Sequence, residues 1–178
     1  ADAIAEADGI PGLRVHRSWW VAREAVASAR KAGFKNLNLD LIYGLPEQTL
    51  ETWQTTVQRI LDLHPEHISA YALTLEHGTP FGRWASKGLL PFPDPDLAAE
   101  MYESASETFE ANGYALYEIS NWAKTASGGM QNWENSAFSV LPSGFQCRHN
   151  LQYWRSLPYL GLGAGAHGYV EGLRYSNV

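Results

Sequence analysis

The stretch Asn36-Leu37-Asn38-Leu39-Asp40-Leu41-Ile42-Tyr43-Gly44-Leu45-Pro46 decides the fold, because it alternates as a β-strand does and ends in a tight turn. Successive side chains of a strand point to opposite faces, so the strand's leucines share one face while Asn36, Asn38 and Asp40 share the other. A central strand of a parallel sheet usually reads as a continuous apolar run, and a buried carboxylate without partners is costly. We therefore expect Asp40 to meet either solvent, on an edge strand, or a polar ligand.

The surrounding sequence alternates between strand-like and helical patterns. Residues 49–63 carry apolar side chains at helical spacing, and Asp94-Pro95 gives a second helix its cap and its first-turn proline. Other predicted elements are a helix over 18–32 with Ser18 as N-cap and Gly33 as its stop, a short helix over 81–87, strands over 67–75, 114–120 and 159–169, and a hairpin turn at 170–173. The alternation predicts an α/β fold, in which ligands gather at the carboxyl ends of the strands.

Composition narrows the class of protein. The chain has 178 residues, is 45% hydrophobic and carries a formal net charge of −6, which fits one domain with a sizeable core. The acidic balance and the lack of a basic run argue against a nucleic-acid partner, and no apolar run reaches the ~18 residues of a membrane span. A single cysteine, Cys147, allows no intramolecular disulfide. Because the chain does not begin with Met, we expect it to be a piece of a longer protein.

Four motifs in order carry a resemblance to a known family: NLDLIYGLP at 38–46, YEISNWA at 117–123, CRHNLQYW at 147–154 and YLGLGAGAHGY at 159–169. The sequence resembles the oxygen-independent coproporphyrinogen III oxidase family of radical SAM proteins, and within it the branch of HemW-type haem chaperones. The likeness runs from about Arg14 to the end of the chain. It is interrupted between Lys124 and Cys147, where we predict a loop insertion over residues 125–146.

The resemblance implies the carboxyl-terminal half of a radical SAM partial (β/α)6 TIM-type barrel, with residues 1–178 as part of that one domain. The family's amino-terminal half carries a Cys-x3-Cys-x2-Cys motif that binds a [4Fe-4S] cluster and leaves one iron for SAM. An iron–sulfur cluster requires several thiolates, and this chain has one cysteine. The cluster ligands are therefore expected outside this chain, which alone is expected to be inactive.

By the same resemblance, four residues are candidates for SAM binding. Arg14 matches an arginine for the SAM carboxylate, although its spacing to Asp40 is one residue longer than in the family; the alternative is a surface arginine. Asp40 matches the acceptor of the ribose hydroxyls, the alternative being a solvated strand aspartate. Ala72 matches a position that contacts the SAM adenine, which an alanine can do only through its backbone or because its side chain is small. The alternative is a core alanine. His167 stands where the oxidases have an aliphatic residue against SAM, or is a buried structural histidine.

The motif His149-Asn150-Leu151-Gln152-Tyr153-Trp154 resembles the His-Asn-x-x-Tyr-Trp signature of the haem-chaperone branch. Haem iron accepts an imidazole as axial ligand, and Tyr153 and Trp154 can stack on a flat macrocycle. This assigns His149 to the haem iron and Asn150, Tyr153 and Trp154 to the haem. The alternative is a structural histidine beside a packed aromatic pair. Cys147 is either a second soft ligand or an inert buried thiol.

The glycines before Tyr169 and the residue Glu118 each allow two interpretations. Gly161, Gly163 and Gly165 fall on one face of the predicted strand, which either lets a ligand approach the backbone or marks a crowded strand. Glu118 either lines a cavity or makes a structural hydrogen bond to a neighbouring strand. The other histidines read as solvated or capping: His16, His64, His67 and His77.

Two functions follow from the resemblance. The first is a haem chaperone that binds haem and passes it to haem-receiving apoproteins, with SAM and the cluster as cofactors. The second is an oxygen-independent oxidase that decarboxylates coproporphyrinogen III. A third alternative is a protein fragment without activity. The motif at His149 favours the first. We expect a cytoplasmic protein, organellar in a eukaryote, that meets membranes only through its client proteins.

Overall fold

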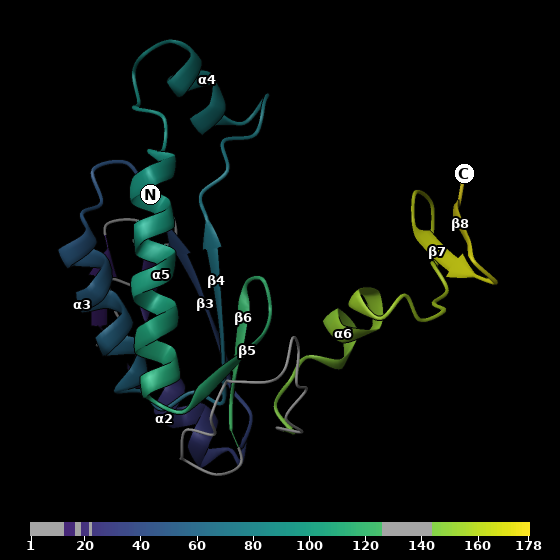
Figure 1. Cartoon of the computed structure of the whole chain (residues 1–178), viewed down its shortest axis with the longest axis horizontal. Helices are drawn as coiled ribbons and strands as arrows, with labels where there is room; N and C mark the ends of the chain where they lie inside the picture. Colours follow the sequence, from purple (N-terminus) through teal and green to yellow (C-terminus); the bar gives the residue numbers. More distant parts are fainter. Residues whose placement is uncertain (1–12, 17–18, 22, 126–143) are drawn as a thin grey trace. The chain divides into compact units, whose positions relative to one another are not determined.

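The computed structural model describes residues 13–16, 19–21, 23–125 and 144–178 (Figure 1). The chain divides into two compact units, Ala1–Phe145 and Gln146–Val178. The first unit contains, in chain order, β1 (Leu13–His16), β2 (Trp19–Val21), α2 (Arg23–Lys31), β3 (Asn38–Tyr43), α3 (Leu50–Leu61), β4 (His67–Ala72), α4 (Pro80–Ser86), α5 (Pro95–Ala111), β5 (Tyr114–Glu118) and β6 (Asn121–Lys124). None of the helices in these ranges is long and apolar enough to cross a membrane.

The main sheet of the first unit has the strand order β3-β4-β6-β5. β3 runs parallel to β4, with Asp40 opposite Ser69, whereas β6 is antiparallel to both β4 and β5. The predicted strand at 114–120 therefore ends early, at Glu118, and the chain returns as β6. The Glu118 carboxylate closes this hairpin, because it accepts hydrogen bonds from the Ser120 backbone N–H, at 3.2 Å, and from the Asn121 side chain.

Helices α3 and α5 lie side by side against one face of this sheet (Figure 1). The alternation read from the sequence is confirmed, since Leu41 and Tyr43 of β3 point into the core beneath them. The predicted apolar stripe of α3 is buried at Trp53, Val57, Ile60 and Leu61. Trp53 is fully buried, and its indole Nε1–H donates to the Met101 backbone carbonyl of α5 at 2.7 Å. This bond joins the two helices that cover the sheet.

Local sequence signals begin these two helices where they were predicted. The Thr49 side chain accepts from the Thr52 backbone N–H at the start of α3, and Asp94 accepts from the N–H groups of Asp96 and Leu97 at the start of α5. The turn between β3 and α3 is held by Gln48, whose buried Oε1 accepts from the Leu45 N–H at 3.1 Å. The exit from the strand that carries Asp40 is therefore tight and fixed.

The predicted helix over 18–32 starts later than expected. Residues 19–21 form β2, which pairs with β1, and the helix α2 runs only from Arg23 to Lys31. Two tryptophans and a valine favour a strand over a helix start. The predicted stop is confirmed, because Gly33 follows with a φ of +95°. Ser18 and nearly all of the predicted insertion at 125–146 lie outside the described residues.

The second unit contains α6 (Arg148–Trp154), β7 (His167–Val170) and β8 (Leu173–Ser176). β7 and β8 form the predicted hairpin, whose turn residues Glu171 and Gly172 both have positive φ. The predicted strand over 159–169 is wrong for most of its length. Only Tyr159 pairs with β7, by an isolated bridge to Tyr169. The glycines between them form a loop, which positive φ angles at Gly163 and Gly165 allow.

Candidate functional site

A polar face lies on the main sheet opposite the helices. By strand alternation and register, Asn38, Asp40 and Ile42 of β3 share this face with His67, Ser69 and Tyr71 of β4. Asp40 is exposed, as the sequence predicted for the polar side of the strand. At its carboxyl end the face carries two exposed apolar side chains, Ile42 at 44% and Tyr71 at 43% exposure. A carboxylate therefore stands beside apolar surface at the end of two parallel strands, where α/β proteins bind ligands.

A chain of hydrogen bonds fixes this carboxylate. Asn38 Nδ2 lies 2.7 Å from Asp40 Oδ1, and because an ionised carboxylate only accepts, the amide nitrogen must be the donor. The Asn38 carbonyl oxygen then accepts from Ser69 Oγ, at 3.3 Å, and from His67 Nδ1–H, at 2.6 Å. With its proton on Nδ1, neutral His67 accepts at Nε2 from the Tyr117 hydroxyl, at 2.7 Å. The relay thus runs from Tyr117 through His67 and Asn38 to Asp40.

His67 was expected to be solvated or capping, and that expectation is wrong. Its side chain is buried, with 6% of its surface exposed, and both ring nitrogens are hydrogen-bonded. Burial lowers the pKa of His67 below its ordinary value of 6.5, against the opposing pull of Asp40 and Glu118. The neutral imidazole that the relay requires is therefore the form that the folded protein favours.

The lowered pKa of His67 predicts a pH-dependent stability. The unfolded chain takes up the imidazole proton at a higher pH than the folded chain, so the contribution of this group is complete above pH 6.5 and declines as the pH falls toward the folded-state pKa. The slope from this one proton is at most about 1.4 kcal/mol per pH unit. Urea unfolding of the full-length protein between pH 7.5 and 5.5 should show a shallower slope for His67→Gln than for wild type.

The matched control for this titration is His64→Gln, which alters an exposed histidine three residues earlier in the chain. That variant should keep the wild-type pH slope. Identical slopes in wild type and His67→Gln would mean that His67 does not titrate differently in the folded and unfolded states.

The other predicted SAM residues of the first unit, Arg14 and Ala72, have no described side chain on this polar face. Arg14 lies in β1, and its side chain is outside the described part of the structure. Ala72 ends β4 opposite Tyr43, so alternation turns its Cβ to the helix-covered side, away from the face of Asp40. A ligand beside Asp40 would meet the backbone of Ala72 and the exposed ring of Tyr71. Glu118 makes the structural hydrogen bonds that were its alternative reading.

In the second unit, the predicted haem residues lie on α6. His149 and Tyr153, one turn apart, pack edge to face with ring centroids 4.8 Å apart. Asn150 and Trp154 occupy the next positions around the helix, and Trp154 is 56% exposed. Cys147 directly precedes the helix and is half-buried. Tyr153 continues the aromatic contact to Tyr159, at 4.7 Å between centroids.

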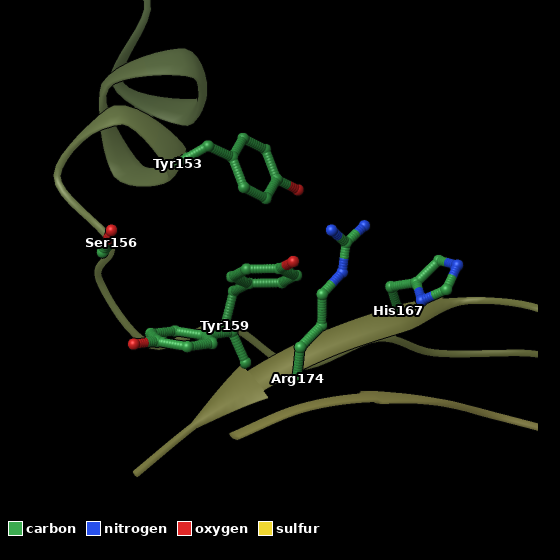
Figure 2. Close-up of a pocket in the computed structure, with 6 residues that line it drawn as sticks. Tyr153, Ser156, Tyr159, His167 and Arg174 are labelled. Atoms are coloured by element: carbon green, nitrogen blue, oxygen red, sulfur yellow. The ribbon is translucent and has the colours of Figure 1, made fainter. Parts of the chain in front are cut away.

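A pocket of about 530 Å³ opens between α6 and the β7–β8 hairpin (Figure 2). Its lining comprises Tyr153, Ser156, Tyr159, His167, Tyr169 and Arg174. Sequence reasoning placed Tyr153 with haem and His167 with SAM, whereas the structure brings both to this one pocket. Sequence reasoning also missed Tyr159, Tyr169 and Arg174, although the alternation of the predicted hairpin could have put the last two on one face.

The glycine loop before β7 supports the hairpin. A Cβ on Gly161 would clash with the backbone of His167, and the Asn177 side chain donates to the carbonyls of Gly161 and Gly163, at 2.9 and 3.0 Å. The crowded-backbone reading of the glycines therefore applies to Gly161. Within the described residues, no group of three or more His, Cys, Asp or Glu side chains is arranged to hold a metal ion.

Comparison with solved structures identifies the class of fold. The chain matches the structure described as "Coproporphyrinogen III oxidase (HemN) from Escherichia coli is a Radical SAM enzyme", with a TM-score of 0.55 and 20% identity, over 84% of this chain and 33% of that one. The predicted α/β fold is confirmed as a part of the radical SAM fold. No protein-family model matches the chain.

Curated proteins point to one branch of that class. The chain is 39% identical over 155 residues to the "Heme chaperone HemW" of Lactococcus lactis, which covers 87% of this chain and 36% of the relative. It is also 39% identical over 147 residues to the mouse "Radical S-adenosyl methionine domain-containing protein 1, mitochondrial", covering 83% of this chain and 29% of the relative. The predicted resemblance to the HemW-type haem chaperones is thereby confirmed. The chain spans about a third of the length of these curated relatives.

Proposed function

We propose that the chain is part of a haem chaperone, which binds haem and transfers it to haem-receiving apoproteins. The observation that carries this proposal is the 39% identity to the Lactococcus lactis haem chaperone over 87% of the chain. Decarboxylation of coproporphyrinogen III is the second candidate function. Its support is the structural likeness to the Escherichia coli oxidase. At 20% identity, this likeness shows a shared fold and not a shared activity.

The residues of α6 fit a haem. Haem needs a lone pair for its iron and flat apolar surface for its ring. His149 is exposed on the helix and has Tyr153 packed against it edge to face, which restricts the orientation of the imidazole. In this proposal His149 binds the iron, Tyr153 and Trp154 contact the macrocycle, and Asn150 supplies a hydrogen bond at its edge. The bound haem would itself be the molecule that is transferred to client proteins.

The polar face of the sheet fits the ribose of SAM. Asn38 occupies one oxygen of Asp40, so the second oxygen keeps its acceptor capacity for ribose hydroxyls. Exposed Ile42 and Tyr71 next to it offer apolar surface for the rest of the nucleoside. We retain Arg14 and Ala72 as proposed SAM contacts, with Ala72 acting through its backbone. The SAM role of His167 stays a prediction from the resemblance alone, because His167 lines the pocket of the second unit.

A [4Fe-4S] cluster does not fit this chain by itself. Cys147 is its one cysteine, and such clusters are held by several thiolates. The cluster proposed for the whole protein would take its ligands from elsewhere. We further propose a cytoplasmic protein, organellar in a eukaryote as the name of the mouse relative indicates for that protein, with no nucleic-acid partner.

The test of this function is haem binding by the full-length protein. Wild type should bind haem with an imidazole-type absorption spectrum, because His149 offers an imidazole nitrogen as axial ligand. His149→Ala should weaken binding or change the axial ligation while leaving SAM affinity unchanged. His77→Ala, which removes an exposed histidine after β4, is the matched control and should retain the wild-type spectrum.

Two results would count against the chaperone. Unchanged haem affinity and spectrum in His149→Ala would remove the proposed iron ligand. Conversion of coproporphyrinogen III to protoporphyrinogen IX by the full-length protein with SAM and a reductant would favour the oxidase instead.

A further inference from the structure

Three side chains form a row across the second unit, on the face of the hairpin that lines the pocket. Tyr159 and Tyr169 face each other across two backbone hydrogen bonds of 2.8 Å, and their rings are stacked with centroids 6.4 Å apart. Tyr169 is in turn the register partner of Arg174 on β8. Directly opposite residues of paired strands project to the same side, so two aromatic rings and one guanidinium stand next to one another.

Within residues 144–178, the charge of Arg174 has no ion-pair partner. Residues 146–178 carry three arginines and one carboxylate, Glu171, although the whole chain is acidic. Glu171 sits in the hairpin turn, and among residues 144–178 no carboxylate forms an ion pair with Arg174. Figure 2 shows the Arg174 side chain extending away from β8, on the side of the pocket where Tyr153 lies. A guanidinium offers a planar fork of donors that matches a carboxylate.

The rest of the pocket suits a flat ligand. Its volume of about 530 Å³ falls within the range of small-molecule sites. Three of its six lining residues are tyrosines, whose rings offer flat surface, and the others are polar or charged. Tyr153 and Tyr159 supply aromatic walls at right angles to each other. Asn177 donates to two carbonyls of the glycine loop that follows Tyr159, so the backbone on the Tyr159 side of the pocket is held by hydrogen bonds.

We propose that this pocket takes one edge of a flat macrocycle bearing carboxylates, and that Arg174 binds one of those carboxylates. The inference rests on the proposed function and deepens it: the macrocycle is haem, the carboxylate is a propionate, and the iron is bound separately by His149. Tyr153, which touches the ring of His149 and also lines the pocket, joins the two parts of the site.

The test compares haem with haem dimethyl ester, in which both propionates are neutral. Optical titration of the full-length protein should show that Arg174→Gln weakens haem binding by about tenfold or more, the loss of one charge-assisted interaction. The same variant should bind the dimethyl ester as wild type does. The absorption maxima of bound haem should not move, because the axial ligand is untouched. Arg174→Lys keeps the charge but loses the planar pair of donors. Its haem affinity should therefore lie between those of wild type and Arg174→Gln.

Arg155→Gln is the matched control, since Arg155 is an exposed arginine at the end of α6 that does not line the pocket. It should bind haem like wild type. A haem affinity of Arg174→Gln within twofold of wild type, or an equal loss for haem and its ester, would overturn the carboxylate site while leaving the chaperone intact. Failure of wild type to bind haem at all would overturn both.

Discussion

Replacing Trp53 with alanine will lower the free energy of unfolding of the full-length protein by about 3–5 kcal/mol. Trp53 is fully buried in α3, packs at 5.4 Å from the Tyr43 ring of β3, and donates to the Met101 carbonyl of α5. The substitution therefore leaves a cavity where two helices meet the sheet, and it also removes the indole hydrogen bond that the Met101 carbonyl accepts in addition to its bond within α5. Both effects act in the same direction.

Urea unfolding followed by fluorescence or circular dichroism would measure this loss. Trp84→Ala is the matched control, because Trp84 of α4 is 47% exposed, and its loss should cost less than about 1 kcal/mol. A Trp53→Ala variant within about 1 kcal/mol of wild type would show that α3 and α5 do not cover the sheet as described.

The elements beside the main sheet could be predicted because their local signals agree with their tertiary surroundings. The strand around Asp40 alternates, and the structure buries its apolar half under α3 and α5. The predicted cap at Asp94 begins its helix as expected, and the helix predicted over 49–63 begins after Thr49, which caps it. In each case a short pattern of a few residues suffices, because strand alternation and helix capping act between near neighbours in the chain.

Other features depend on contacts between distant residues, and the sequence could not reveal them. His67 resembles any histidine at a strand end, but its two partners, Asn38 and Tyr117, lie 29 and 50 positions away. β6 was missed because the hairpin is closed by the Glu118 side chain and not by a turn with glycine or asparagine at its centre. The glycines at 161–165 were predicted to form a strand because their spacing matches its period, whereas the structure has a loop there, with positive φ angles at Gly163 and Gly165.

On the polar face, Asp40 was predicted from the sequence, whereas the residues that orient its carboxylate were not. Asp40 is the predicted SAM contact, but it is Asn38, held by His67 and Ser69, that orients the carboxylate. One oxygen is engaged by the Asn38 amide, so the geometry of the other is set before any ligand arrives. Preorganisation of this kind favours binding, because fewer side chains must be ordered when the ligand binds.

Asp40→Ala should therefore weaken SAM binding by the full-length protein by about 1.5–3 kcal/mol, the loss of hydrogen bonds to a charged acceptor, which is roughly a 10- to 150-fold higher Kd. Asn38→Ala keeps the carboxylate but removes its positioning group, so its effect should be smaller and in the same direction. Equilibrium binding by calorimetry would measure both. Haem affinity should be unchanged in either variant if the two ligands occupy separate sites.

Asp62→Ala is the matched control for this loss of negative charge, because Asp62 is an exposed carboxylate at the end of α3. It should leave the SAM Kd unchanged, which would exclude a general electrostatic effect. An Asp40→Ala variant whose SAM Kd lies within twofold of wild type would refute the ribose role. An Asn38→Ala variant as impaired as Asp40→Ala would instead mean that the position of the carboxylate matters as much as its presence.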